Sequence, residues 1–389
     1  LYIPFGIKSD IGKLQLNRAN LLGINIIKKY SLASNYYSLI VDCLFGSGLS
    51  RPLDNISTKI IKQLNKIDCY KLACDIPSGI NKQGQLSPIC FQANTTITMG
   101  ALKKSLFTDN VKQYIGKIKV ANLGIQREVY ENNSNYFLLN KKDMILPIRN
   151  NKISNKGSFG HLSVICGEKQ GASLIAAEAG FAFGCGLITA INKKPIKKIK
   201  NSIMQNNKLP KNTSAICVGM GLGAKIKLKQ LDNTIPKVID ADLFYNTKIL
   251  KLLNQDNIVL TPHPKEFCSL LKLCDIDTID IQTLQNNRFY YIEQFSKKYP
   301  NITILLKGVN VLIAFNSKIY INTLGTSVLS KGGSGDVLTG LIGSLLAQGY
   351  TPVNAAINGS LAHTIAASNY KGNNYSLSPE ELISQIKKL

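Results

Sequence analysis

Short runs of β-branched residues alternate with longer amphipathic stretches along the whole chain. This alternation is typical of βα units, in which helices join the strands of a mostly parallel sheet. In the first part of the chain the pattern predicts strands over 36–45, 69–76 and 95–100, and a helix over 56–67. A chain organised in this way is expected to fold as an α/β protein.

The same pattern continues in the second part of the chain. Strands are predicted over 161–166, 186–192, 214–219, 237–242, 257–261, 302–308 and 311–315. Helices are predicted over 172–183, 264–273, 283–299, 335–349 and 352–369. Between Gln126 and Lys156 the pattern loosens into a polar, asparagine-rich passage, so we place a domain boundary near residue 130. Domain 1–130 would then precede domain 131–389.

Composition agrees with a globular protein that has more than one core. Of the 389 residues, 44% are hydrophobic and 18% are charged. No stretch approaches the roughly 18–20 consecutive apolar residues that a membrane-spanning helix needs, and no secretory signal opens the sequence. The nine cysteines contain no C-x-x-C pair, which argues against a zinc site and a disulfide framework. We therefore expect a cytoplasmic protein with no membrane partner.

The net charge of +24 could indicate nucleic-acid binding, because a basic surface attracts phosphate backbones. The lysines, however, are spread along the sequence, and only 193–200 forms a dense cluster. A solvated basic surface explains this distribution better, and we expect no nucleic-acid partner. The alternative, a basic nucleic-acid-binding protein, predicts binding that weakens steeply with salt.

The strongest candidate site is the sequence KGGSGDVLTG at 331–340, where a helical pattern begins at Val337. Its glycines allow main-chain N–H groups to converge on an anion, and the helix that follows adds the positive end of its dipole. Asp336 would repel a phosphate here, unless it takes a proton from a hydroxyl group during phosphoryl transfer. The alternative is that Asp336 caps its helix. The surrounding glycines favour the role of a base.

Two further motifs follow predicted strands. Lys307 and Gly308 end the strand at 302–308, at the edge of the sheet where ligands of α/β proteins bind. His263 follows the strand at 257–261 and lies between two prolines, which fix the turn. A lysine at a strand end is often only solvated and a single histidine is often structural, but both stand where they could touch a substrate.

Glycine and aspartate residues follow two more strands. The sequence VGMGLG at 218–223 would let a ligand approach the main chain, although glycine turns after strands are common. The sequence VIDAD ends in Asp240 and Asp242, which would either serve a metal or cap a helix. All four motifs lie at the carboxyl ends of predicted strands, so one cleft could collect them.

These motifs resemble a known family, the bifunctional NAD(P)H-hydrate repair enzymes. In that family a Rossmann-like α/β epimerase domain precedes a ribokinase-like, ADP-dependent dehydratase domain. The dehydratase resemblance runs in order through KGSFGHLSVICG, GASLIAAEAG, VGMGLG, VIDAD, TPHPKEF, LLKGVNVLIA and KGGSGDVLTGLIGSLLAQG. The epimerase resemblance runs through LIVDCLFGSGLSRPL, LACDIPSGI and TITMGALKKSLF.

The resemblance implies a dehydratase site in the second domain. In the family, ADP phosphorylates the hydroxyl group of the hydrated nicotinamide ring, and loss of phosphate restores NAD(P)H with AMP and phosphate as products. Asp336 would deprotonate this hydroxyl, while the glycine loop and Mg²⁺ would stabilise the phosphoryl charge. The implied contacts with the hydrated nicotinamide come from Ala172, Gly221, Gly223, His263 and Asp336. The implied contacts with ADP come from Lys307, Gly308, Val309, Asn310, Val311 and Gly335.

The resemblance also implies an epimerase site in the first domain. Asp42 and Ser78 match positions that bind K⁺, and Asp75 matches an acid that contacts the substrate. The implied substrate loop comprises Gly46, Ser47, Gly48, Leu49, Ser50, Arg51 and Pro52. The family's N-x-G-G-D glycine loop, which should precede these motifs, is absent from the sequence. We expect either that the sequence is truncated or that the epimerase domain persists only as a structural part.

Three departures from the family pattern bear on the nucleotide site. Residues 326–328 (Thr-Ser-Val) replace a usual Pro-Gly, Val311 stands where threonine is common, and Lys265 replaces a glycine. These changes would weaken nucleotide binding. We expect NAD(P)H-hydrate and ADP as ligands and a homo-oligomer as the assembly. The alternatives are a ribokinase-like small-molecule kinase and a degenerate nucleotide-binding protein that has kept the fold.

Overall fold

The structure, a computed structural model, describes residues 1–27, 37–223, 231 and 234–389. These residues form two compact units. The first comprises Leu1–Lys82, Leu86–Leu102 and Gln113–Leu123, and the second comprises Gln83–Gln85, Lys103–Lys112 and Gly124–Leu389. The segment Lys103–Lys112 therefore packs with the second unit, although residues of the first unit flank it in sequence. The domain boundary near residue 130 stays a prediction.

The first unit is built on a four-stranded parallel sheet with the order β1-β2-β3-β4. Its strands are β1 (Leu39–Asp42), β2 (Tyr70–Cys74), β3 (Thr95–Met99) and β4 (Lys117–Ala121), and its helices are α1 (Asp10–Leu21), α2 (Asn55–Lys66) and α3 (Lys112–Ile115), of which α3 begins in the segment assigned to the second unit. The predicted strands and helix of this part are confirmed. Tyr36, at the start of the first predicted strand, lies outside the described residues.

Helix α2 forms because its sequence supplies both a cap and an apolar face. The Asp54 carboxylate accepts a hydrogen bond from the N–H of Ser57 at 2.7 Å, which satisfies a donor that the first turn leaves open. Ile60, Ile61 and Leu64 recur at helical spacing and are buried against the sheet. The core of the first unit lies under this helix.

The second unit is built on a ten-stranded sheet with the order β5-β14-β13-β12-β11-β10-β9-β6-β7-β8. Neighbouring strands are parallel except for β12 with β13 and β13 with β14. The strands are β5 (Tyr136–Leu139), β6 (His161–Ile165), β7 (Leu187–Ile191), β8 (Met204–Asn206), β9 (Ala215–Val218), β10 (Lys237–Ile239), β11 (Ile258–Leu260), β12 (Thr303–Leu306), β13 (Val311–Phe315) and β14 (Lys318–Asn322). The predicted α/β fold with a mostly parallel sheet is confirmed.

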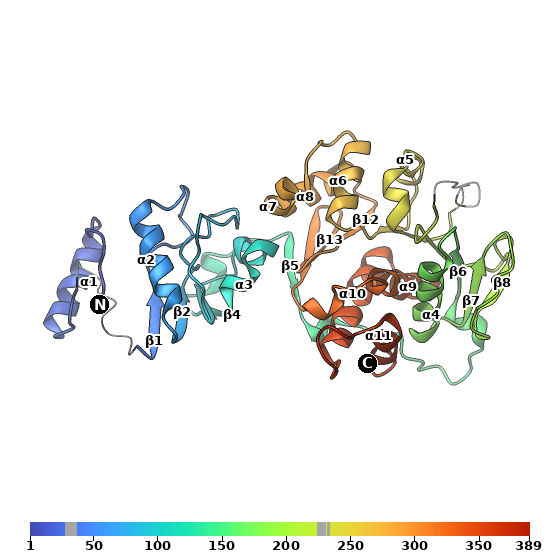
Figure 1. Ribbon diagram of the computed structural model, residues 1–389, viewed down its shortest axis with the longest axis horizontal. Helices are drawn as coiled ribbons and strands as arrows, with labels where there is room; N and C mark the ends of the chain where they lie inside the picture. The colour runs from blue at the N-terminus through green and yellow to red at the C-terminus, as the bar shows by residue number, and fades with distance from the viewer. Residues whose placement is uncertain (28–36, 224–230, 232–233) are drawn as a thin grey trace. The chain divides into compact units, whose positions relative to one another are not determined.

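Helices cover both faces of this sheet (Figure 1). Helices α4, α9 and α10 pack on one face, with α11 against α4 and α9, while α8 packs on β12 and β13 from the other face. The helices are α4 (Gln170–Ala182), α5 (Ile249–Leu252), α6 (Pro264–Leu273), α7 (Ile281–Asn286), α8 (Arg288–Lys298), α9 (Ser334–Ala347), α10 (Pro352–Ser368) and α11 (Pro379–Ile386).

Two details of the second unit differ from the sequence-based expectation. The helix predicted over 283–299 is two helices, because Asn287 leaves the helical conformation at φ −135° and ψ 32°. The polar passage 126–156 contains strand β5, which forms the edge of the sheet and pairs with β14. The pattern failed there because β5 is only four residues long and alternates weakly in burial.

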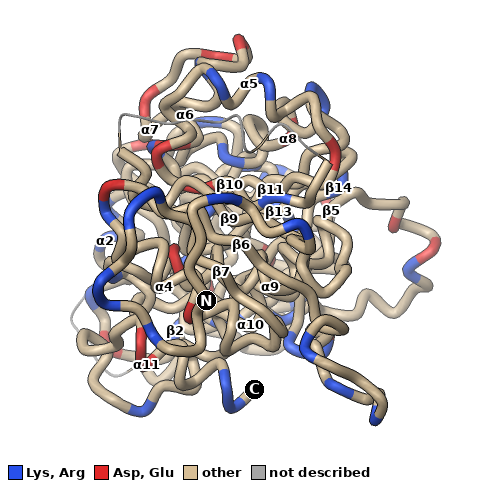
Figure 2. The backbone as a smooth tube through the Cα atoms, turned by 90° about the vertical axis from the view of Figure 1, so that its right-hand side faces the viewer, with Lys and Arg blue, Asp and Glu red and all other residues tan. Residues whose placement is uncertain are grey.

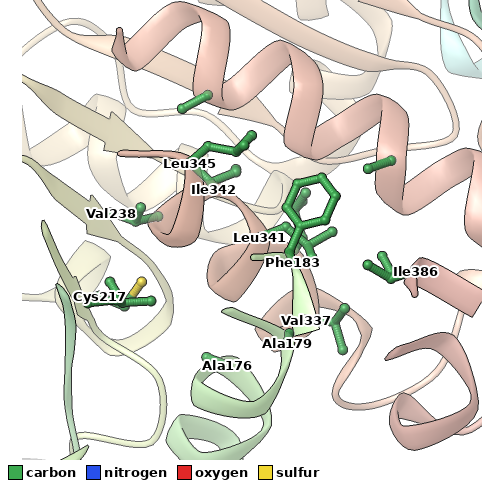
Figure 3. Packing of buried hydrophobic residues seen from close by; sticks show 14 of the residues in the cluster. Ala176, Ala179, Phe183, Cys217, Val238, Val337, Leu341, Ile342, Leu345 and Ile386 are labelled. Carbon is green, nitrogen blue, oxygen red and sulfur yellow. The ribbon is translucent and has the colours of Figure 1, made fainter. Parts of the chain in front are cut away.

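The core of the second unit forms where α4 crosses α9 (Figure 3). A Cβ atom on Gly340 would lie 2.1 Å from the carbonyl oxygen of Ala176, so only glycine allows the two helices to come this close. Val337, Leu341 and Leu345 on α9 fill the layer between the helices and the sheet. This packing fixes the position of the α9 N-terminus relative to the strand ends.

Within the described residues, no helix is long and apolar enough to cross a membrane. Figure 2 shows the lysine and arginine positions along the backbone trace, and they are distributed over many elements.

Candidate active site

Five parallel strands bring the predicted motifs to one edge of the large sheet. Strands β12, β11, β10, β9 and β6 are consecutive neighbours, so their carboxyl ends lie side by side. Lys307 follows β12, the turn 261–263 follows β11, Asp240 follows β10, the turn 219–223 follows β9, and 167–172 follows β6. Parallel sheets bind ligands at this edge.

The Asp240 carboxylate joins two strands to helix α9. Lys307 Nζ donates to Asp240 Oδ1 at 2.9 Å, and Thr339 Oγ1 donates to Asp240 Oδ2 at 2.8 Å. Asp240 stands at the N-cap position of the 3₁₀ turn 241–245, but its side chain makes no capping hydrogen bond there. Burial alone would lower the pKa of Lys307, but the charges of Asp240 and Glu266 raise it. The lysine is therefore a fixed cation at the sheet edge.

Asp336 is the third residue of α9, and the N-cap of this helix is Gly333 with φ 90°. The alternative that Asp336 is the N-cap is therefore wrong. Burial raises the pKa of the Asp336 carboxyl group to about 6, the charge of Asp240 adds to this effect, and the charge of Lys307 opposes it. A carboxylate with such a pKa is ionised near neutral pH and can accept a proton.

The first turn of α9 presents main-chain donors beside this carboxylate. Among the described residues, no acceptor contacts the N–H of Gly335 or the N–H of Asp336. A Cβ atom on Gly335 would lie 3.5 Å from Lys307 Nζ, so the ammonium group stands next to these donors. Two open N–H groups, a 14-residue helix and a lysine favour the binding of an anion.

His263 has a structural role that is visible in the fold. It is the N-cap of α6, where its Nδ1 accepts from the N–H of Glu266 at 3.2 Å, and Glu266 Oε2 accepts from the N–H of His263 at 2.7 Å. The imidazole is nevertheless 45% exposed, and its Nε2 lies 3.2 Å from Glu266 Oε1. Burial, followed by the charge of Lys307, lowers the pKa of His263. The ring is therefore neutral and reachable near pH 7.

Glu266 was missed as a site residue in the sequence, and so was Thr339. Burial raises the pKa of Glu266 to about 7, against the opposing charge of Lys307, whose Nζ lies 3.9 Å from Glu266 Oε2. Lys307 thus faces the carboxylates of Asp240, Glu266 and Asp336 together. The three carboxylates carry more negative charge than one lysine neutralises, so binding of a proton or a cation would stabilise this edge. The capping-box spacing of His263 and Glu266 was the available signal in the sequence.

The glycine turn after β9 packs against the loop that precedes α4. Lys169 N donates to the carbonyl oxygen of Gly221 at 2.9 Å, and Ser173 Oγ donates to the carbonyl oxygen of Met220 at 2.9 Å. A Cβ on Gly221, which has φ 60°, would lie 2.4 Å from the Lys169 carbonyl oxygen. Gly223 belongs to the same glycine turn, and Ala172 lies in the first turn of α4, next to Ser173. The structure thus brings Ala172, Gly221 and Gly223 together.

The predicted ADP-binding residues 307–311 form a tight turn between β12 and the antiparallel strand β13. Lys307 N donates to the Pro262 carbonyl oxygen at 2.9 Å, which links this turn to the His263 turn. Val309 is exposed, whereas the side chain of Asn310 is buried. We call residues 307–311 the nucleotide loop.

The first unit brings four of the predicted site residues together in two contacts. Asp42 Oδ1 accepts from Ser78 Oγ at 2.7 Å, and Asp42 Oδ2 accepts from Ser78 N at 2.7 Å. Burial raises the pKa of Asp42 although these hydrogen bonds oppose the shift. Asp75, with φ 70°, accepts from the N–H of Ser47 at 3.1 Å. A non-glycine residue at positive φ carries backbone strain, which is frequent at functional sites.

The remaining loop residues of the first unit differ in exposure. Gly46 lies against Asp75, since a Cβ on this glycine would be 3.2 Å from Asp75 Oδ2. Leu49 is buried in the core of the unit, while Gly48, Ser50, Arg51 and Pro52 are exposed. The exposed residues Gly48, Ser50, Arg51 and Pro52 thus form the outer part of the loop, and Leu49 anchors it in the core.

A cavity of about 1110 Å³ lies in the first unit beside β1. Its lining is mostly apolar and includes Tyr2, Phe5 and Ile27, with Asp42 and Cys43 at the end of the strand. Within the described residues, no group of three His, Cys, Asp or Glu side chains is arranged to hold a metal ion.

Family models match both parts of the chain. A model described as NAD(P)H-hydrate dehydratase matches residues 162–388, which is more than half of the 389 residues. A model described as YjeF-related protein N-terminus matches residues 1–105. The bifunctional NAD(P)H-hydrate repair enzyme of Helicobacter pylori is 40% identical, over 98% of this chain and 82% of that protein. The protein of the same name from Coxiella burnetii is 33% identical, over 85% of this chain and 70% of its own length.

Solved structures show the same fold. A ribokinase-like superfamily protein of Enterococcus faecalis has a TM-score of 0.53 and 23% identity, over 67% of this chain and 97% of that chain. The ADP/ATP-dependent NAD(P)H-hydrate dehydratase of Bacillus subtilis, co-crystallised with ATP and Mg²⁺, has a TM-score of 0.52 and 23% identity, over 62% of this chain and 92% of its own. The ribokinase-like fold predicted from the sequence is confirmed. The chain belongs to the family of bifunctional NAD(P)H-hydrate repair enzymes.

Proposed function

We propose that the second unit dehydrates NAD(P)H-hydrate to NAD(P)H in an ADP-dependent reaction. The observation that carries this proposal is the Asp336 carboxylate, which stands beside two open main-chain N–H groups and the fixed cation of Lys307. This arrangement lies at the ligand edge of a ribokinase-like sheet, in a chain that belongs to the repair-enzyme family. A base next to an anion site is what phosphoryl transfer to an alcohol requires.

The hydrated nicotinamide ring would lie against the glycine turn that holds Gly221 and Gly223 and against the first turn of α4, which holds Ala172, with His263 at its side. ADP would use the nucleotide loop and the N–H of Gly335. The ring hydroxyl would then face Asp336, whose carboxylate is ionised at neutral pH and can take the hydroxyl proton. The hydroxyl oxygen bonds to the β-phosphorus of ADP, and AMP leaves as the bond between the two phosphates breaks.

The second half of the reaction needs no further acid. The ring nitrogen's electron pair expels phosphate from the carbon that carried the hydroxyl. Loss of a proton from the neighbouring carbon restores the ring double bond, so the products are NAD(P)H, AMP and phosphate. The N–H groups of α9 and Lys307 stabilise the charge of the phosphoryl group as it moves, an effect worth roughly 3–4 kcal/mol for one such donor.

The residues present fit a magnesium ion in this site. Asp240 and Glu266 supply carboxylate oxygens where one lysine faces three acids, and Mg²⁺ commonly binds one or two carboxylates together with substrate phosphates. The ion would neutralise phosphoryl charge when it is bound. No group of three acids is arranged for a metal among the described residues, so phosphate oxygens would complete the coordination.

The test is an assay with hydrated NADH, ADP and Mg²⁺. The absorbance of the reduced nicotinamide should increase as NADH forms, and AMP and phosphate should be released in equal amounts. Asp336→Asn should abolish turnover and leave ADP affinity within a few-fold of wild type, because the open N–H groups stay in place. A small-molecule kinase would transfer phosphate to another alcohol without recovery of absorbance. A degenerate binding protein would bind ADP and give the same null result for both proteins.

A second activity, epimerisation of NAD(P)H-hydrate, is proposed for the first unit. It is supported by the strained Asp75, which lies against Ser47, and by the buried pair of Asp42 and Ser78. Their oxygens fit a hard cation such as K⁺. Interconversion of the two hydrate epimers should depend on K⁺, and no interconversion by the wild-type protein would reject this activity. A cytoplasmic location and assembly into a homo-oligomer stay predictions.

A further inference from the structure

We propose that Asp109, paired with Arg288, is a positioning residue that holds the nucleotide loop in its binding shape. The segment Lys103–Lys112 would thereby set the affinity of the second unit for ADP. This inference rests on the proposed binding of ADP at the nucleotide loop. Neither Asp109 nor Arg288 belongs to a motif that the sequence analysis identified.

Asp109 is bonded to the main chain of the nucleotide loop. Its Oδ2 accepts from the N–H of Val309 at 3.1 Å, and its Oδ1 accepts from the N–H of Asn310 at 3.0 Å. Two consecutive main-chain donors are thus fixed by one carboxylate. Each hydrogen bond to a charged acceptor is stronger than a neutral one, so the turn has little freedom to change its conformation.

Arg288 binds both Asp109 and the nucleotide loop. We call the pair of Asp109 and Arg288, with its contacts to this loop, the clamp. The guanidinium forms an ion pair with Asp109 and donates through Nη2 to the carbonyl oxygens of Lys307 at 3.1 Å and Leu306 at 3.3 Å. The side chains of Arg288 and Asp109 are only 1% and 7% exposed. A buried ion pair of this kind is tightly bound to its surroundings, and removal of one partner leaves an unpaired buried charge.

Gly308 of the nucleotide loop leaves room for the side chains of Asp109 and Arg288. A Cβ atom there would lie 2.4 Å from Arg288 Nη1 and 2.5 Å from Asp109 Oδ2. Only a residue without a side chain allows the charged pair to approach the main chain this closely. The glycine at this position is therefore needed for the close approach of Arg288 and Asp109.

A second set of contacts from the same segment holds the far end of the loop. Asn310 Nδ2 donates to the Phe107 carbonyl oxygen at 2.9 Å, and Lys112 Nζ donates to Asn310 Oδ1 at 3.1 Å. Lys112 Nζ also donates to the carbonyl oxygen of Thr323 at 2.7 Å, just after β14. The buried side chain of Asn310 is thus satisfied entirely by the segment.

These contacts assign Asp109 a positioning role and not a catalytic one. Both of its carboxylate oxygens are used by the loop and by Arg288, and its side chain is buried. The loop begins at Lys307, whose ammonium group binds Asp240 at the centre of the site. A loop that is fixed before ADP arrives loses less conformational entropy on binding, which increases affinity.

The experiment compares wild type with Asp109→Asn, Asp109→Glu and Lys112→Met in the full chain. ADP dissociation constants would be measured by calorimetry, and KM values for ADP and for hydrated NADH would be measured separately. Asp109→Asn should weaken ADP binding and raise KM for ADP about ten-fold. The KM for hydrated NADH should change less than about two-fold. Asp109→Glu should restore part of the affinity, and Lys112→Met should weaken ADP binding about three-fold.

Asn358→Ala is the matched control. Its Oδ1 accepts from the N–H of Ile145 and its Nδ2 donates to the Asn354 carbonyl oxygen, so this variant also loses buried hydrogen bonds, but none to the nucleotide loop. It should lower the melting temperature and leave ADP affinity unchanged.

Three results would overturn the inference. One is an Asp109→Asn protein that melts earlier and binds ADP as wild type does. Another is an Asn358→Ala protein whose ADP affinity falls as much as that of Asp109→Asn, because the loss would then follow stability. If Asp109→Asn does not fold, an unchanged ADP affinity in Lys112→Met decides against the clamp. Failure of the wild type itself to bind ADP would instead reject the nucleotide site and the clamp together.

Discussion

Replacing Asp336 by asparagine should stabilise the folded protein at pH 8 while it removes the proposed base. Burial raises the pKa of the Asp336 carboxyl group from 3.8 to about 6, and the charge of Asp240 adds to this effect. The ionised side chain is therefore less favourable in the folded protein than in the unfolded chain. Asparagine has a similar shape and no charge, so it removes this cost.

The size of the gain follows from the pKa difference. A shift of about two pKa units corresponds to about 3 kcal/mol of unfolding free energy. Because Asp336 is partly exposed, solvent screens part of this cost, and we expect a gain of about 1–2 kcal/mol. The carboxyl group favours the folded state while it is protonated, and this contribution is lost as the pH rises through about 6. The gain from Asp336→Asn should therefore be complete at pH 8 and nearly absent at pH 4.

Urea unfolding followed by circular dichroism at pH 4, 6 and 8 measures this gain. Asp256→Asn is a suitable control, because Asp256 is an exposed carboxylate of the same unit. Its substitution should give no gain that grows with pH. The reasoning is refuted if Asp336→Asn unfolds at lower urea than wild type at pH 8, or if its gain is equal at pH 4 and pH 8.

Four further predictions concern activity and packing. The kcat/KM for hydrated NADH should fall as the pH decreases below about 6, because protonated Asp336 cannot accept the hydroxyl proton, and a flat profile between pH 5 and 8 would contradict this role. Lys307→Met should lower kcat about 100-fold in the absorbance assay, since the cation facing the phosphoryl group is lost; activity within a few-fold of wild type would exclude this role. Gly340→Ala should cost about 1–3 kcal/mol in urea unfolding, because the new methyl group meets the Ala176 carbonyl oxygen, and an unchanged midpoint would show that the helices can separate freely. Asp75→Asn should slow interconversion of the hydrate epimers at least about 100-fold, followed by chromatography, and should leave dehydration intact; loss of both activities would point to a folding defect.

The alternation of strands and helices could be predicted because it reflects local propensity and burial periodicity. The strands that precede Asp240, His263 and Lys307 could be predicted in this way, because a short buried strand appears in the sequence as an apolar run bounded by turn residues. The secondary-structure predictions failed where local sequence signals are weak. The helix interruption at Asn287 and the edge strand β5 depend on neighbours that the sequence pattern does not contain.

The sequence by itself determined the chemistry that is available to this protein. Glycines before a helix, a carboxylate among them and a lysine at a strand end are properties of residue type and local order, so the motif at 331–340 and the family resemblance were visible without coordinates. Local sequence also fixed the capping box that begins at His263.

Only the tertiary structure decided how these groups act on one another. Asp240 contacts Lys307 and Thr339 because β10, β11 and β12 are neighbours in the sheet and α9 packs against β10. The pKa of Asp336 depends on burial and on the charge of Asp240, and neither is a local property. The pairing of Asp109 with Arg288 joins residues far apart in sequence. Electrostatic coupling depends on distance and on exclusion of water, and both exist only after the chain has folded.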